Sequence, residues 1–291
     1  MHFPPALPRN TRAALPEHYR RFFVARNGEP DLEHRQLPRR ETASVRWKTK
    51  SAMLAQTVKP PISREAFDRL RSVEGASSET NPLLRWLVSL SKANESEAWG
   101  VDYLLSRAAA RDGSQDTRRL ADLEEIYHTE ALRHVVRSFG LDFELSTPPF
   151  LTRTMIRAMA HVPDRLSNVF LVLGEVMGVI AFEQFLDDAT DAVGAYPDHL
   201  PFAQELLSEI LVDELGHVNL MFARMTRTDL VISRCLLPLV FFIIRSSFLQ
   251  DDEDVKRYRE ALARFDTKRF PGYLVERSYS ARNGIVMPQR S

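Results

Sequence analysis

The amino-acid sequence predicts an all-α protein. Apolar residues recur every three or four positions over long stretches between residues 81 and 265, which is the period of helices with one buried face. Turn and cap residues separate these stretches, and the core region has no alternating apolar pattern of the kind that predicts strands. With 291 residues and 44% hydrophobic content, the chain can bury a substantial core.

The first predicted elements follow from caps and breakers. Residues 1–80 are rich in proline and arginine, and predict an irregular N-terminal arm with one helix, over 63–73. Asn81 and Pro82 stand in the preferred order of cap and first helical residue, so a helix is predicted over 82–110.

Six further helices are predicted after it. A turn at 111–114 leads into a helix over 116–139, which should end at Gly140 because glycine favours the C-terminal cap. The remaining predicted helices cover 147–161, 163–188, 201–225, 229–249 and 251–265, and an extended tail follows them. The helix over 229–249 should be kinked at Pro238. We therefore divide the chain into the arm (1–80), a four-helix core domain (81–225) and C-terminal helices with a tail packed on it (226–291).

Composition excludes several classes of protein. Lys+Arg and Asp+Glu number 39 each, so no net charge favours nucleic acid or an anionic membrane surface as a partner. The most apolar stretch, 236–244, contains a proline and is too short to span a membrane. A single cysteine, Cys235, and an N-terminus without an apolar signal segment predict a cytoplasmic location.

Two copies of one motif carry the chemistry: Glu125-x-x-His128 and Glu214-x-x-His217. Side chains three residues apart on a helix point the same way and can reach one ion together. About thirty residues before each motif, an apolar helical stripe is interrupted by a lone glutamate, Glu97 or Glu183. Buried carboxylates without compensation destabilise a core, and two divalent cations would balance four of them.

Hairpin geometry supports these partners. In an antiparallel pair, residues that meet are equidistant from the turn, and both glutamates meet this condition when the second turn is placed at 197–201. Glu175 then lies about one helical turn away from the position level with Glu214. Its expected role is to line a path for iron or substrate, or to pair with an arginine. Glu95 remains an alternative to Glu97, although it lies off the apolar stripe.

A glutamate from each of two helices and Glu-x-x-His from each of two others is the ligand pattern of ferritin-like di-metal carboxylate proteins. Residues 81–225 thus resemble the ferritin-like di-iron carboxylate superfamily, in its oxygenase and oxidase branch. The resemblance implies a ferritin-like four-helix bundle in which two glutamates bridge the metals. It assigns the metal ligands, which are also the catalytic groups, to two sets: Glu97, Glu125 and His128; Glu183, Glu214 and His217.

The resemblance further implies that Asp213 and Glu124, each preceding a motif, orient the histidine of the opposite motif. The ligand types suit two iron ions, with manganese as the alternative. The expected function is oxidation of a small organic substrate with dioxygen, by C–H hydroxylation, desaturation or N-oxidation. An external electron donor, a reductase or a ferredoxin, is then required, and a homodimer is compatible. Known N-oxygenases of the superfamily carry an extra histidine at the position where this chain has Ile210, and this difference weighs against N-oxidation.

A ferroxidase or iron-storage protein is the alternative function, because ferritins share the ligand pattern. The 80 residues before the core domain and the 66 after it favour an enzyme, since a storage subunit needs little beyond the bundle.

Overall fold

The computed structural model of the chain describes residues 9–71, 81–109, 117–147, 154, 157, 161–162, 164–248 and 252–264. Within these ranges the protein is helical and contains no strand, which confirms the predicted all-α class. The helices are α1 (Arg9–Asn27), α2 (Pro38–Ala55), α3 (Arg64–Arg71), α4 (Pro82–Ala109), α5 (Thr117–Arg137), α7 (Asp164–Val193), α8 (His199–Arg224), α9 (Arg227–Phe248) and α10 (Asp252–Arg264).

From α3 onward, these helices begin and end within two residues of their predicted limits, except that α7 ends at Val193, five residues beyond its predicted end. The side-chain oxygen of Asn81 caps α4 by accepting the backbone N–H groups of Leu83 and Leu84, at 2.9 and 3.3 Å. Gly140 follows α5 with a φ of 71°, the left-handed conformation that glycine adopts without strain. The predicted turn at 111–114, most of the helix over 147–161 and the tail lie outside the described residues.

The prediction of an irregular N-terminal arm is wrong, because residues 9–71 contain three helices. The reason is visible in α2, whose buried residues follow a helical spacing but are half polar: Arg40, Trp47, Ser51 and Leu54. An arginine on the inward face removes the apolar period on which the prediction depends. Helix α1 buries Tyr19, Phe22 and Phe23, but it contains Pro16 and many charges.

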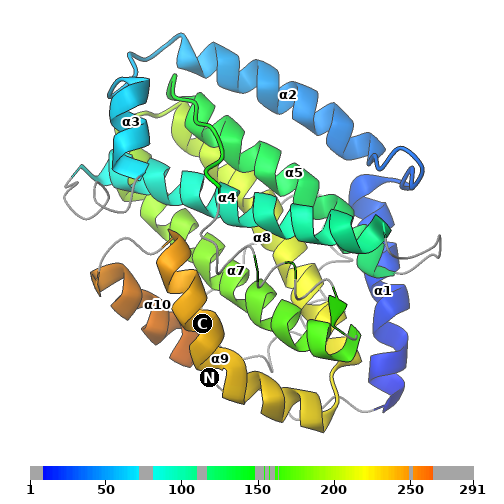
Figure 1. The fold of residues 1–291 in the computed structure, drawn as a ribbon. Helices are drawn as coiled ribbons and strands as arrows, with labels where there is room; N and C mark the ends of the chain where they lie inside the picture. The colour runs from blue at the N-terminus through cyan, green and yellow to red at the C-terminus, as the bar shows by residue number, and fades with distance from the viewer. Residues whose placement is uncertain are drawn as a thin grey trace.

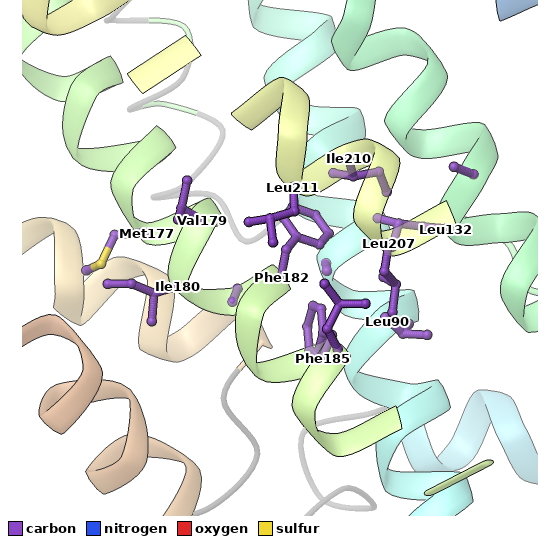
Figure 2. Close-up of a cluster of buried hydrophobic side chains, with 14 of the residues drawn as sticks. Leu90, Leu132, Met177, Val179, Ile180, Phe182, Phe185, Leu207, Ile210 and Leu211 are labelled. Atoms are coloured by element: carbon purple, nitrogen blue, oxygen red, sulfur yellow. The ribbon is translucent and has the colours of Figure 1, made fainter. Parts of the chain in front are cut away.

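Four helices enclose the main core. Helix α4 contacts α5 and α7, and α8 contacts the same two helices (Figure 1). Leu90 from α4, Leu132 from α5, Phe182 from α7 and Leu207 from α8 point towards one another and are buried (Figure 2). All four helices therefore contribute to one apolar core.

The other helices cover two different sides of these four. Helices α1 and α2 pack on α5, and α1 also packs on α8. Helices α9 and α10 pack on α7, and α9 also reaches α4 (Figure 1). The close approach of α1 depends on Gly216 of α8, where a Cβ atom would lie 3.0 Å from the ring of Phe22.

Helix α7 is long and apolar enough to cross a membrane by length and composition alone. In the structure it contacts α4, α8, α9 and α10, and 61% of its most apolar window is buried inside the protein. Its composition is therefore accounted for by its place in the core.

Candidate metal centre

Two adjoining groups of carboxylates and histidines lie between α4, α5, α7 and α8. Within each group, one ligand atom from every side chain lies within 4.8 Å of the others. Glu125 and Glu214 belong to both groups, so the two groups form one centre with shared carboxylates. The groups are Glu97, Glu125, His128 and Glu214; and Glu125, Glu175, Glu214 and His217.

Five of the six ligands predicted from the sequence meet in this centre, and the sixth does not. Glu183 is described with an exposed side chain on α7, so its prediction as a ligand is wrong. Glu175, two turns earlier on the same helix, takes its place and lies between Glu125, Glu214 and His217.

The error with Glu183 has two physical causes. Residues Val176 to Phe182 are all buried except Gly178, so α7 is apolar around most of its circumference and its inward face cannot be identified from period alone. In addition, α7 ends at Val193 and α8 begins at His199, which centres the turn near residue 196. That centre is closer to the midpoint of Glu175 and Glu214 than to that of Glu183 and Glu214.

The alternative first-helix ligand, Glu95, has a different role. Its carboxylate is paired with Arg71 of α3 and accepts a hydrogen bond from the backbone N–H of Ser146 at 3.1 Å. These contacts direct it away from the centre, and Glu97 remains as the ligand candidate on α4.

Each histidine presents its two ring nitrogens to different partners. In His128, Nε2 lies 3.2 Å from Asp213, while Nδ1 lies 3.4 Å from both Glu125 and Glu214. The predicted contact between the acidic residue of one motif and the histidine of the other is therefore present. It orients the imidazole and leaves Nδ1 facing the carboxylates.

His217 repeats this arrangement. Its Nε2 lies 3.0 Å from Glu124, and its Nδ1 lies 3.0 Å from Glu125 and 3.3 Å from Glu175. The two imidazole rings lie side by side, with centroids 5.9 Å apart. Both predicted outer carboxylates, Asp213 and Glu124, thus lie where they can orient the opposite histidine.

The inward-facing nitrogens fit a metal better than a hydrogen bond. The Nδ1 atoms of His128 and His217 are buried, and neither has a hydrogen-bond partner among the described residues. A buried nitrogen without a hydrogen bond destabilises the folded state, whereas coordination to a metal ion would use the lone pair of that nitrogen. The residues present therefore fit one imidazole ligand for each of two ions.

Gly178 of α7 makes room for a shared carboxylate. A Cβ atom at this position would lie 2.8 Å from Oε2 of Glu214, closer than such atoms approach in real structures. The absence of a side chain lets α7 approach α8 at the height of the centre.

Helices α1 and α2 contribute contacts that the sequence did not reveal. Tyr19 donates a hydrogen bond to Glu124 at 2.8 Å, and the Asn27 amide donates another at 2.5 Å. Arg40 donates to Asp213 at 2.5 Å and to Asn27 at 2.6 Å. Asn27 and Arg40 thereby link the outer carboxylates of both histidines. An arginine in an arginine-rich segment carries no sequence pattern that would predict this.

Arg26 adds a second cation to this outer layer. It donates to Asp213 at 2.9 Å and to Glu209 at 2.7 Å. Burial alone would raise the pKa of Asp213, but the charges of Arg26 and Arg40 lower this pKa well below its ordinary value. Asp213 is therefore a fixed anion, able to accept the Nε2 proton of His128.

The pKa values of the inner groups show a demand for positive charge. Burial, and then the charge of Glu125, raise the pKa of both Glu97 and Glu214. Burial alone would lower the pKa of His128, but the nearby Glu125 raises it above its ordinary value. The cluster therefore holds protons or cations in preference to carrying its full negative charge.

A count of the charges also indicates that the cluster requires additional positive charge. Four inner carboxylates (Glu97, Glu125, Glu175 and Glu214) and two outer ones (Glu124 and Asp213) face two arginines, Arg26 and Arg40. The excess of four negative charges among these residues equals the charge of two divalent cations. Glu209 is left out of the count because its side chain is 30% exposed.

Comparison of the chain with family models, with curated proteins and with solved structures gives no significant match. Function must therefore be argued from the centre itself.

Proposed function

We propose that the chain is a ferritin-like four-helix di-iron protein that oxidises a small organic substrate with dioxygen. The observation that supports this most directly is the pair of four-residue groups sharing Glu125 and Glu214. Two carboxylates common to two sites, with one histidine at each, are what a pair of bridged metal ions requires.

The chemistry of the ligands favours iron. Glu97 and His128 would hold one ion, Glu175 and His217 the other, and the shared glutamates would bridge them. Carboxylates and imidazoles without thiolate suit iron or manganese by ligand type. Two ferrous ions, when bound, supply the electrons and the coordination positions needed to activate dioxygen.

The residues of the chain have distinct tasks in this function. Asp213 and Glu124 hold the two imidazoles by their Nε2 atoms, so that both Nδ1 atoms face inward. Helices α1 and α2 exclude water from the histidine side, where His128 and His217 are at most 1% exposed. A buried, preorganised centre keeps a reactive oxidant away from solvent. Electrons for repeated turnover would come from an external donor.

Iron oxidation for storage is the competing function, since it would use the same ligands. The helices outside the four-helix core favour an enzyme. Helices α1 and α2 extend the hydrogen-bond network of the centre, and α9 and α10 enlarge the structure around α7 and α4. A ferroxidase site needs no such additions.

The test begins with anaerobic ferrous loading of the purified chain. We expect two irons per chain, and loss of both in Glu125→Ala, because that residue is shared. Oxygen should then produce a transient visible absorption and oxidise the two irons without mineral growth. Fewer than two irons in the unmodified chain would refute the metal centre. Iron accumulation far above two per chain, in a large cage by size exclusion, would instead establish storage.

A further inference from the structure

Two hydrogen bonds fix how α4 and α7 run beside each other. Near the start of α4, the Trp86 indole donates to the Phe185 carbonyl at 3.0 Å. Near its end, the hydroxyls of Tyr103 and Ser167 are 2.7 Å apart. Rising residue numbers on α4 meet falling numbers on α7, so the helices are antiparallel and joined on both sides of the metal centre.

Equal rise per residue on both helices sets the register between these two contacts. Glu97 then lies level with Gly174, and Gly100 lies level with Leu171. Two helical glycines therefore fall in the layer of the metal centre, one on each helix. Glycine is among the least favourable residues inside a helix, so a reason for both must be sought in the space around them.

That space is open. A Cβ atom at Gly100 or at Gly174 would meet no other heavy atom of the described structure within 4 Å. Gly174 is exposed, and the ligands beside the two glycines, Glu97 and Glu175, are each only partly buried. On this side, the described residues leave the two glycines uncovered.

The opposite side is closed. His128 and His217 are 1% and 0% exposed, and their outer partners Asp213 and Glu124 are both fully buried. The α1 and α2 network described above covers them. Both orphaned Nδ1 atoms point away from this sealed side, into the cluster of carboxylates that the open side adjoins. The histidine side is therefore closed by described residues to a molecule that would reach the metals.

We propose that the seam between α4 and α7 at Gly100 and Gly174 is the route by which a small, uncharged organic molecule reaches the metal centre. This inference rests on the proposed function. The carboxylates of Glu97 and Glu175 flank the route and disfavour anions. Val101 and Leu171, both partly exposed beside it, offer apolar contacts. Glycine at each position keeps the passage free of side chains.

The experiment measures removal of iron by bipyridine, an uncharged flat chelator whose ferrous complex is coloured. Gly100→Leu and Gly174→Leu, each loaded with ferrous ion, are compared with the unmodified chain. We expect extraction to depend on bipyridine concentration in the unmodified chain, and to slow by about tenfold or more in both variants. The control is Thr190→Leu, on an exposed position of α7 about 24 Å further along the helix, which should leave the rate unchanged.

Leucine raises helix propensity over glycine, so neither variant should unfold, and circular dichroism would verify this. Unchanged extraction rates in both variants, with two irons retained, would refute the route and leave the metal centre standing. A rate independent of chelator concentration would also refute it, because opening of the whole protein would then limit extraction. Loss of iron from either variant would also refute the route, because the glycine would then be needed to build the centre. Failure of the unmodified chain to bind iron would remove the proposed function together with the route.

Discussion

Replacing Arg40 with glutamine should test whether α2 is part of the metal centre. Arg40 is 5% exposed and donates to Asp213, to Asn27 and, at 3.2 Å, to Glu209. Breaking a buried ion pair by removing one partner costs about 3–5 kcal/mol, because the remaining charge is left uncompensated. Arg26 still contacts Asp213, so we expect a loss near the lower limit, about 3 kcal/mol.

The assay is urea unfolding of the metal-free protein, with Arg46→Gln as the matched control. Arg46 lies on the same helix and pairs with Glu205, but their side chains are 67% and 41% exposed, so its loss should cost less than about 1 kcal/mol. In the loaded protein, Arg40→Gln should also weaken metal binding, since Asp213 would hold His128 less firmly. Equal unfolding midpoints for the two variants would show that the Arg40 contacts add nothing, and would refute the reasoning.

Three further outcomes are expected. Glu175→Gln should lower iron stoichiometry, whereas Glu183→Gln should leave two irons per chain; the reverse result in metal analysis would restore the ligand predicted from sequence. Gly178→Ala should displace Glu214 and weaken metal binding by about tenfold or more in a metal titration, with unfolding little affected; unchanged affinity would contradict the close approach. Burial, and then nearby cationic side chains, lower the pKa of His134 to about 4, so below its ordinary pKa of 6.5 the unfolded chain takes up a proton that the native state refuses. Native stability should therefore fall from pH 6.5 to 4, with His134 contributing on the order of 2 kcal/mol after solvent screening; the same fall in His134→Gln would assign it to other groups.

The sequence predicted most of the centre because its signals were local. Asn81 caps α4 and Gly140 ends α5 through interactions within one turn of chain, and both are in place. The Glu-x-x-His spacing depends only on helical geometry, so it places both ligands of each motif on one face. Glu97 was found because it interrupts an otherwise apolar stripe on α4.

Signals that depend on tertiary packing were not available from the sequence. Glu175 and Glu183 lie on one helix buried on nearly all sides, and only contact with α8 distinguishes them. From the sequence alone, Arg40 is expected at the surface, as most arginines are. Its buried partner, Asp213, lies 173 residues later in the chain. A buried charge is stable only beside its partner, so its position cannot be inferred from local pattern.

The N-terminal helices are thus better regarded as part of the centre than as an arm attached to it. If Arg26 and Arg40 were absent, the six carboxylates would retain six negative charges against the four positive charges of two divalent ions. A deficit of two charges in a buried site would be met by proton uptake, and a protonated Asp213 could no longer hold His128 in the orientation that metal binding needs. The two arginines keep Asp213 ionised, which would leave the inner carboxylates for metal ions. In the proposed di-metal centre, binding of both ions would therefore require that α1 and α2 fold onto α5 and α8.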